Sequence, residues 1–480
     1  MSAEHRRLSG RSLAIIGAGY VGLVTAACLA RMGHRVTLLE VSRPRLAALR
    51  AGRVPFHEPG LQALLDASLA AGRLSATDDP GAALLDRDAV LVCVGTPLNE
   101  DGEADLSQVR AACRAIAHHA PKATVVLRST LPLGSSASLA TWLRRHDLSG
   151  VVTNPEFLRQ GTAVADFLAP SRIVIGTHDG RRNASAQLLE RLYVGLDAPI
   201  LVTDYASADM IKNAANAFLA TKLSFINEIA DLCEAYGADV ERVVEGMGLD
   251  PRIGPTYLRP GIGFGGSCLP KELSNLMRLG RDRGLPVHLL HAASHDNGGR
   301  ARRIADRLAR LVDGVAGRRV AMLGLSFKPD TDDLRYSPAL ALAVALLERG
   351  ARVIGHDPVV GAASTAHVAG LERADSVEAA CRGAELVVLA TEWDDYRQLD
   401  WRRLRMVVRR PLLFDGRNAL DAPRLRAAGW EVARVGYRSE PLRPQPAGIR
   451  WPSAHAALLS AQGSRGARRS RQISPAPMNR

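Results

Sequence analysis

Lysine is almost absent from this 480-residue chain, although 62 of its residues are lysine or arginine. The lysines are Lys122, Lys212, Lys222, Lys271 and Lys328. Drift of the composition toward arginine explains the bias as a whole. A lysine retained against such a drift indicates a position that needs a compact, titratable ammonium.

Closely paired cysteines are also missing. The six cysteines are scattered, and no two of them are separated by only two residues. Neither a disulfide framework nor a zinc site is therefore indicated, and we expect no metal. Scattered free thiols fit a reducing compartment, so we predict a cytoplasmic protein.

Acidic residues are too few to balance the basic ones, and the formal net charge is +13. Part of the excess lies in residues 439–480, where proline, serine and arginine are frequent. This composition predicts a disordered basic tail rather than a surface that binds nucleic acid. We expect no nucleic-acid partner.

Charge is missing altogether from residues 12–30, which follow Arg6, Arg7 and Arg11. This pattern is open to interpretation as a signal peptide or a membrane span. A dinucleotide fingerprint in the same stretch is the better explanation. We therefore expect no association with a membrane.

The fingerprint is a strand, a glycine turn, a helix and a second strand that ends in an acid. Gly17, Gly19 and Gly22 form a GxGxxG motif, and Glu40 follows about 20 residues later, as dinucleotide sites require. Glu40 can accept hydrogen bonds from a ribose diol and would repel a 2′-phosphate, which favours NAD over NADP. The predicted cofactor residues are Gly17, Gly19, Tyr20, Val21, Gly22, Glu40, Thr96 and Thr130.

Further apolar strands follow at the spacing of alternating strands and helices, and three of them end in polar motifs. Thr96, Thr130 and Glu156 each follow such a strand. Ligands of open α/β sheets bind outside the carboxyl ends of the strands, so these three side chains are expected at one crevice. Taken singly, each could instead be a turn residue or a helix cap.

A long helix is predicted from Tyr205 to about Tyr236, because no proline or glycine interrupts its apolar periodicity. Lys212 and Asn216 lie four residues apart and therefore on one face of it. Polar residues inside so apolar a helix suggest a functional role, although both could point to solvent.

The loop from Gly263 to Glu272 puts Cys268 among glycines, with Lys271 close behind it. Glycines allow a ligand to approach the backbone closely. A nearby cation favours the thiolate, which is the nucleophilic form. The alternative is a small buried residue in a turn.

A second α/β unit without the full fingerprint begins near Arg319. The fold class is therefore α/β, with two Rossmann-like doubly wound domains joined by a long central helix and a helical segment. We predict a cofactor domain at 11–203, a central helical domain at 204–314, a second Rossmann-like domain at 315–438 and the tail at 439–480.

Together these motifs resemble the UDP-glucose/GDP-mannose dehydrogenase family over almost the whole chain, from Leu13 to Asn418. The resemblance rests on the fingerprint and seven further segments. These are Glu58–Leu61, Val94–Pro97, Ser129-Thr130, Asn154–Leu158, Asn216–Phe218, the cysteine loop and Phe327–Pro329.

The resemblance implies NAD-dependent oxidation of the C6 alcohol of UDP-glucose to a carboxylate through a cysteine-bound thiohemiacetal and thioester, in a homodimer. The implied catalytic residues are Cys268, Lys212, Asn216, Glu156, Thr130 and Glu272. The implied substrate-binding residues are Phe157, Leu158, Lys212, Asn216, Arg252, Phe264, Gly265, Lys328 and Arg417. Arg252 is expected to reach the site of a neighbouring subunit.

The chain departs from the family pattern at several positions. Glu272 stands where the family normally has aspartate, and Gln160 replaces a usual acid near Glu156. The competing functions are oxidation of GDP-mannose or an N-acetylhexosamine nucleotide, a catalytically silent nucleotide-sugar-binding protein, and a two-electron hydroxyacid dehydrogenase. The last of these would need no cysteine.

Overall fold

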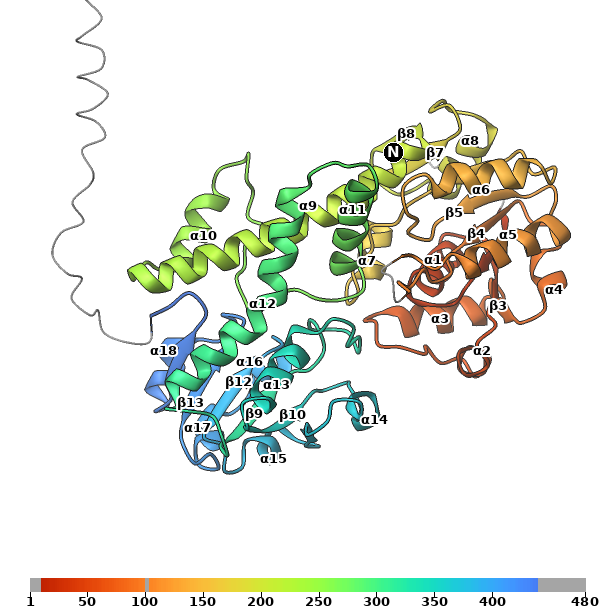
Figure 1. Cartoon of the computed structure of the whole chain (residues 1–480). Helices are drawn as coiled ribbons and strands as arrows, with labels where there is room; N and C mark the ends of the chain where they lie inside the picture. The colour runs from red at the N-terminus through yellow and green to blue at the C-terminus, as the bar shows by residue number, and fades with distance from the viewer. Residues whose placement is uncertain (1–9, 100–102, 439–480) are drawn as a thin grey trace, which may run out of the picture. The chain divides into compact units, whose positions relative to one another are not determined.

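The computed structural model describes residues 10–99 and 103–438, which form two separate β-sheets and a set of connecting helices (Figure 1). The predicted tail at 439–480 lies outside the described residues. Across the described ranges, none of the helices combines the length and the apolar character that a bilayer-spanning segment needs.

The first sheet has eight strands in the order β3-β2-β1-β4-β5-β6-β7-β8. The strands from β3 to β6 are parallel, β6 pairs antiparallel with β7, and β7 is parallel to β8. The strands are β1 (Ser12–Ile16), β2 (Arg35–Leu39), β3 (Leu74–Thr77), β4 (Ala89–Val92), β5 (Thr124–Leu127), β6 (Val151–Thr153), β7 (Ile173–Thr177) and β8 (Ile200–Asp204). The order 3-2-1-4-5-6 of the first six strands is that of a dinucleotide-binding fold, whose ligand lies where the order reverses.

The second sheet has six parallel strands in the order β11-β10-β9-β12-β13-β14. Counted from its own first strand, this is again 3-2-1-4-5-6. The strands are β9 (Arg319–Leu323), β10 (Arg352–His356), β11 (Glu372–Arg373), β12 (Leu386–Leu389), β13 (Leu412–Asp415) and β14 (Glu431–Arg434). The predicted fold class, with two Rossmann-like units and a helical part between them in sequence, is confirmed.

Helices of the first half connect and cover the first sheet. They are α1 (Tyr20–Arg31), α2 (Arg43–Arg50), α3 (Leu61–Ala70), α4 (Pro80–Leu84), α5 (Ser107–His119), α6 (Ser135–Arg144), α7 (Ala163–Leu168) and α8 (Ala184–Leu192). The helices that follow the second sheet's first strand are α13 (Pro338–Leu347), α14 (Ala362–Thr365), α15 (Val377–Cys381), α16 (Asp394–Arg397), α17 (Trp401–Arg405) and α18 (Ala422–Ala427).

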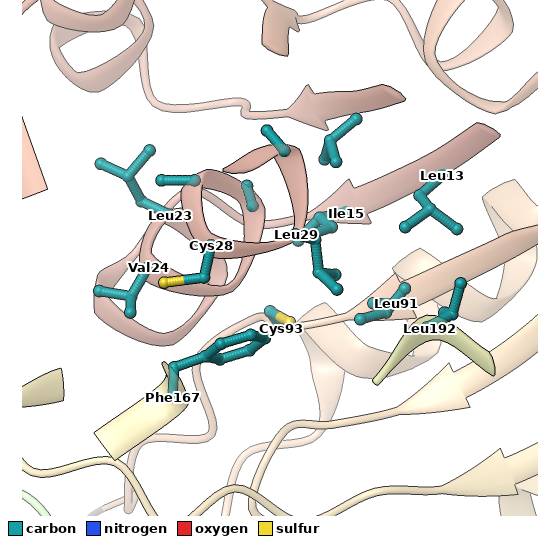
Figure 2. Packing of buried hydrophobic residues seen from close by; sticks show 14 of the residues in the cluster. Leu13, Ile15, Leu23, Val24, Cys28, Leu29, Leu91, Cys93, Phe167 and Leu192 are labelled. Atoms are coloured by element: carbon teal, nitrogen blue, oxygen red, sulfur yellow. The ribbon is translucent and has the colours of Figure 1, made fainter. Parts of the chain in front are cut away.

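The charge-free stretch at 12–30 forms β1 and most of α1, and it belongs to the core of the first unit. Leu13 and Ile15 of the strand and Cys28 of the helix are fully buried in one apolar cluster (Figure 2). Phe167 of α7 packs against the same cluster. The missing charges are thus explained by burial within the sheet and its covering helix.

The helical part contains α9 (Tyr205–Tyr236), α10 (Val240–Gly248), α11 (Leu269–Asp282) and α12 (His288–Leu311). Helix α9 has 32 residues and is therefore about 48 Å long. It begins where Asp204 accepts a hydrogen bond from Ser207 N, and it ends at Gly237, whose φ is +76°. A glycine in the left-handed backbone conformation commonly ends a helix. Its bounds are those predicted from the sequence.

Helix α11 and the strands β3, β11 and β14 were not expected. Strand β3 is short and carries Ser75 and Thr77, and β11 has two residues only. Both lie at the edge of their sheets, where half of the backbone pairing is absent and apolar patterning is weak. Helix α11 starts with Leu269 and Pro270, and proline is favourable at this first turn.

Candidate active site

The glycine turn after β1 has the shape that a dinucleotide requires. Gly17 has φ +96°, and a Cβ at Gly22 would lie 1.8 Å from the Gly17 carbonyl oxygen. A Cβ at Gly19 would meet nothing within 4 Å. Gly19 is also the N-cap of α1, so its open side faces the free N–H groups of that helix. The turn therefore fits a pyrophosphate, as the fingerprint predicts.

Glu40 is buried beside this turn. Its Oε2 accepts a hydrogen bond from Ala18 N at 2.9 Å, and its Oε1 accepts one from Ser42 N at 2.6 Å. Each carboxylate oxygen keeps a further lone pair that could receive a ribose hydroxyl. Tyr20 at the start of α1 donates its hydroxyl to Glu58 at 2.6 Å, so its phenol is engaged by the protein. Val21 lines a cavity that opens beside this turn.

The corresponding turn of the second sheet is also held by an acidic residue that follows the second strand of its sheet. Asp357, at the end of β10, accepts hydrogen bonds from Leu325 N at 2.8 Å and from Ser326 N at 3.0 Å. A Cβ at Gly324 would lie 2.4 Å from that of Thr391. Ser326 takes the position that Gly19 has in the first turn, so the second turn lacks that open glycine.

One cavity of about 2250 Å³ joins the glycine turn to the cysteine loop. It is larger than the volume typical for a drug-sized ligand, and it suits two extended ligands. Its lining includes Gly19, Glu40, Lys212, Cys268 and Lys328. Among the residues that the structure describes, no group of three or more His, Cys, Asp or Glu side chains could hold a metal ion.

On the wall of the cavity, Lys212 forms an ion pair with Glu156. The Nζ–Oε1 distance is 3.1 Å, and the two side chains are only 4% and 5% exposed. Burial acts to lower the pKa of Lys212, but Glu156, Cys268 and Glu272 together raise it. The lysine is therefore a stable ammonium close to the thiol.

Cys268 is the N-cap of α11 and the one cysteine open to solvent, whereas the other five are buried. It lies on the wall of the cavity, so water reaches it although protein atoms surround it. Burial raises the pKa of the thiol, Lys212 opposes the rise, and Glu156 and Glu272 add to it. In the protein without a ligand, the Cys268 thiol therefore holds its proton more strongly than a thiol in water does.

The expectation that Lys271 supplies the cation beside the thiol is wrong. Its ammonium donates hydrogen bonds to Thr96 Oγ1 at 2.8 Å and to Thr96 O at 3.2 Å. Lys212, from a different helix, is the lysine whose charge acts on Cys268. Thr96 in turn donates to Thr130 O at 2.9 Å, which links the ends of β4 and β5.

Two further predicted catalytic side chains, those of Asn216 and Glu272, line the cavity. Asn216 Nδ2 and Glu272 Oε2 are buried, and neither has a hydrogen-bond partner within the described part of the chain. Burial raises the pKa of Glu272, although Lys271 and Lys212 oppose the rise. An amide donor and a carboxyl group whose pKa is raised by burial are therefore available to a bound ligand. Thr130 also lines the cavity.

The predicted sugar-binding residues Phe157, Leu158, Phe264 and Gly265 line the same cavity. The Phe157 ring lies 5.4 Å from Lys212 Nζ. Glycine is required at 265 for a reason other than ligand approach, since a Cβ there would lie 2.0 Å from the Tyr336 carbonyl oxygen. The segment that carries Tyr336 thus packs directly on the cysteine loop.

The predicted cations of the nucleotide end differ in their surroundings. Burial and the neighbouring Arg159 lower the pKa of Lys328, which lines the cavity. Arg417 donates to Ala390 O at 2.7 Å, Gly263 O at 3.1 Å and Phe327 O at 3.3 Å, so three of its nitrogens hold the cavity wall.

Arg252 lies outside the cavity lining and pairs with Asp250 at 2.6 Å. Its side chain is 88% exposed. Its expected role at a neighbouring subunit stays a prediction.

The sequence interpretation missed several residues of the cavity. Tyr257 has φ +61°, an unusual conformation for a bulky residue, and it lines the cavity. Burial raises the pKa of its phenol. Arg172 stacks on the Phe157 ring at 3.7 Å. Tyr257 lies in the otherwise featureless segment before the cysteine loop, and the missing signal is its backbone conformation, which the sequence does not show.

Comparison with known proteins gives matches to three family models in chain order. Residues 11–197 match the NAD-binding domain of the UDP-glucose/GDP-mannose dehydrogenase family, residues 206–298 its central domain and residues 321–422 its UDP-binding domain. NAD as the cofactor, predicted from the fingerprint, is confirmed by the first match.

Relatives and solved structures agree with the family models. The UDP-glucose 6-dehydrogenase of Rhizobium meliloti (strain 1021) is 41% identical over 433 residues, covering 88% of this chain and 99% of the relative. The structure of a UDP-glucose dehydrogenase from Pyrobaculum islandicum has a TM-score of 0.81 and 38% identity, covering 90% of this chain and 99% of that one. The structure of a UDP-D-ManNAc dehydrogenase from Pyrococcus horikoshii has a TM-score of 0.77 and 27% identity, covering 89% of this chain and 100% of that one.

An open dinucleotide turn, a cysteine beside a buried lysine and these matches over nearly the whole described chain lead to one conclusion. The protein belongs to the UDP-glucose/GDP-mannose dehydrogenase family of NAD-dependent oxidoreductases.

Proposed function

We propose that the protein oxidises the C6 alcohol of UDP-glucose to the carboxylate of UDP-glucuronate, using two NAD per sugar. The observation that carries the proposal is the position of Cys268 beside Lys212, in the same cavity as the open turn at Gly19. The activity of the Rhizobium meliloti and Pyrobaculum islandicum relatives supports this choice of substrate.

NAD held at the turn of Gly17, Gly19 and Glu40 would supply the hydride acceptor for the two oxidations. Between them, the Cys268 thiol adds to the C6 aldehyde: a C–S bond forms, the S–H bond breaks, the carbonyl electron pair moves to oxygen, and the thiol proton passes to that oxygen. The Lys212 ammonium and the unpartnered Asn216 amide donate to that oxygen. Capturing the aldehyde as a thiohemiacetal keeps it in the site and allows the second hydride to leave.

Hydrolysis of the resulting thioester needs a positioned water and a path for its proton. Glu156 and Thr130 place the water, whose oxygen forms the new C–O bond as the C–S bond breaks. The released thiolate takes up a proton. Glu272, whose pKa is raised by burial, is a carboxyl able to exchange protons close to the thiol.

The two ends of the nucleotide sugar are assigned to different walls of the cavity. Phe157, Leu158, Phe264 and Gly265 surround the sugar. Lys328 contributes positive charge for the pyrophosphate. Arg417 acts mainly through the cavity wall, because three of its nitrogens are held by backbone carbonyls.

The test is to count NADH formed per sugar with UDP-glucose, GDP-mannose and an N-acetylmannosamine nucleotide. We expect about two NADH per UDP-glucose, since each sugar is oxidised twice. A ratio of one NADH per sugar would show that the protein is a two-electron dehydrogenase. Turnover of only one of the other nucleotide sugars would show that this compound, and not UDP-glucose, is the substrate. A preference for NADP would contradict the role of Glu40.

The same proposal includes a homodimer in the cytoplasm. Helix α9 exposes Phe218, Phe225 and Leu232 at seven-residue spacing, with Tyr236 one turn further. A stripe of this kind suits the packing of a second helix. Light scattering should give twice the chain mass of 51.4 kDa, and Phe225→Arg should produce the monomer. A monomeric wild type would contradict the dimer and the expected role of Arg252.

A further inference from the structure

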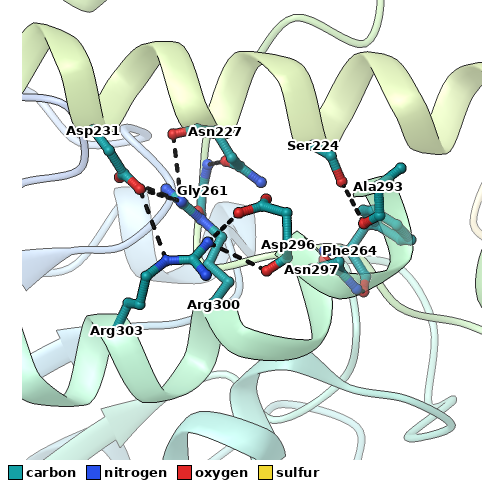
Figure 3. Close-up of polar contacts among 10 residues, drawn as sticks. All are labelled: Ser224, Asn227, Asp231, Gly261, Phe264, Ala293, Asp296, Asn297, Arg300 and Arg303. Carbon is teal, nitrogen blue, oxygen red and sulfur yellow. Dashed lines mark hydrogen bonds and ion pairs between the residues drawn. The ribbon is translucent and has the colours of Figure 1, made fainter. Parts of the chain in front are cut away.

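Side chains of two helices hold the first part of the loop that precedes Cys268, whereas Gly266 N at its end donates to the backbone Arg335 O at 2.9 Å. Gly261 N donates to Asn227 Oδ1 at 2.9 Å, and Gly261 O accepts from Arg300 Nε at 2.6 Å (Figure 3). The donor and the acceptor of this one residue are therefore both fixed, by α9 on one side and α12 on the other.

Phe264, three residues further, is held in the same way by a single side chain. Phe264 N donates to Asn297 Oδ1 at 2.9 Å, and Asn297 Nδ2 donates to Phe264 O at 3.0 Å. A carboxamide has one acceptor and one donor in the arrangement of a peptide group, so it pairs with a backbone as a neighbouring strand would. Figure 3 shows Asn297 directed at Phe264.

Asn297 and Arg300 both belong to α12 and are three positions apart, so they share a face of the helix. The Arg300 side chain is only 1% exposed, and its Nη1 pairs with Asp231 at 3.1 Å. Its Nη2 has no hydrogen-bond partner within the described residues. Burying a guanidinium that is incompletely paired is costly, so stability alone does not account for an arginine here.

The loop between these two anchors contacts the proposed substrate region. Gly263 O, between the anchored residues, accepts a hydrogen bond from Arg417 at 3.1 Å. Phe264 and Gly265 line the cavity, and Cys268 follows within four residues. The conformation of residues 261–266 therefore fixes both the sugar-binding wall and the start of α11.

We propose that Asn297 and Arg300 are positioning residues, which hold the glycine loop at 261–266 in the conformation that places Phe264, Gly265 and Cys268 for the reaction. The inference rests on the proposed function for its kinetic part only. Misplacing reacting groups by about 1 Å can cost about 100-fold in rate, so a loop of glycines needs such anchors.

The test compares Asn297→Ala and Arg300→Lys with two matched controls on the same helix pair. Ser224→Ala removes a buried bond from α9 to Ala293 O, and Arg303→Lys alters an arginine that pairs with Asp231 and Asp296. Neither control touches the loop. Arg300→Lys keeps the charge beside Asp231 and loses the Nε bond to Gly261.

We expect Asn297→Ala and Arg300→Lys to lower kcat/KM for the nucleotide sugar by at least about tenfold, with KM for NAD changed less than about twofold. Both controls should stay within about threefold of the wild type. Equal losses in the controls and the test variants would overturn the proposal, as would full kcat/KM in both test variants.

Hydrogen exchange followed by mass spectrometry gives a second measurement that needs no turnover. In the wild type, the amides of Gly261 and Phe264 should be protected although they lie outside helices and strands. Asn297→Ala should speed exchange in the loop peptide and leave the α9 peptide around Ser224 unchanged. Unprotected wild-type amides would overturn the proposal even if a variant fails to fold.

The two measurements separate this inference from the proposed function. If the wild type forms no NADH with any nucleotide sugar, the proposed function fails, and the exchange data still decide whether the anchors hold the loop. If NADH forms and the anchor variants keep full kcat/KM, the positioning inference alone fails.

Discussion

Lys212 and Glu156 form a buried ion pair that joins the long helix α9 to the loop after β6. Their charged atoms are 3.1 Å apart, and both side chains are at most 5% exposed. Cys268 and Glu272 interact with the same ammonium, so three acidic groups surround one lysine. The pair therefore links stability to the chemistry at the thiol.

Glu156→Gln should destabilise the protein by about 3–5 kcal/mol, because it leaves a buried ammonium without its closest partner. The folded-state pKa of Lys212 is raised. The stabilisation is therefore present below the unfolded lysine pKa of about 10.4, and it is lost as the pH rises through the folded-state value. Urea unfolding at pH 7 and at high pH measures the difference. Glu245→Gln, at the exposed pair with Arg242, is the control and should have no measurable effect.

Alkylation of Cys268 should accelerate with pH around a midpoint above the ordinary thiol value of about 8.5, because burial raises its pKa. Lys212→Met should move the midpoint higher, and Glu272→Gln should move it lower. Peptide mass spectrometry follows the label, and the five buried cysteines serve as internal controls. A midpoint well below 8.5 would contradict the balance of charges described above.

Cys268→Ala should bind NAD normally and form no acid, because the cofactor turn lies in the first unit and the nucleophile is lost. Cys268→Ser should accumulate an ester adduct, since an oxygen ester is a poorer acyl donor than a thioester. Intact-protein mass spectrometry detects the adduct. Acid formation above a few per cent of wild type in the alanine variant would make the cysteine structural.

Gly19→Ala should weaken NAD binding, whereas Gly22→Ala should lower the stability of the fold. Gly19 has an extended backbone with open space around it, so alanine there should fold and weaken NAD binding by at least about tenfold, or 1.4 kcal/mol. A Cβ at Gly22 would meet the Gly17 carbonyl at 1.8 Å, so alanine there should lower the melting temperature. Calorimetric NAD titration and thermal unfolding distinguish the two. Undiminished NAD binding by Gly19→Ala would place the cofactor elsewhere.

Glu272→Asp should keep or raise the rate of NADH formation, because aspartate is the residue that the family usually has here. The Glu272 carboxylate is buried with one oxygen unpartnered, so a shorter side chain breaks no hydrogen bond of that oxygen. Steady-state kinetics measure the effect. A fall of more than about tenfold, or 1.4 kcal/mol of barrier, would make Glu272 a specific adaptation of this chain.

Much of the fold could be predicted because its signals are local. The glycine fingerprint and the uninterrupted periodicity of α9 are patterns of neighbouring residues. The edge strands β3 and β11 were missed because their pairing, and not their apolar content, makes them strands. The division into domains at 203/204 and 314/315 stays a prediction.

The amino-acid sequence shows which chemical groups are present: a cofactor turn, an acid after β2, a cysteine in a glycine loop and a few retained lysines. Which lysine acts on the thiol depends on how the chain folds. Lys271 is three residues from Cys268, yet its ammonium binds Thr96, whereas Lys212 reaches the thiol from α9. Electrostatic interaction depends on distance in space and on burial, and neither quantity can be read from separation along the chain.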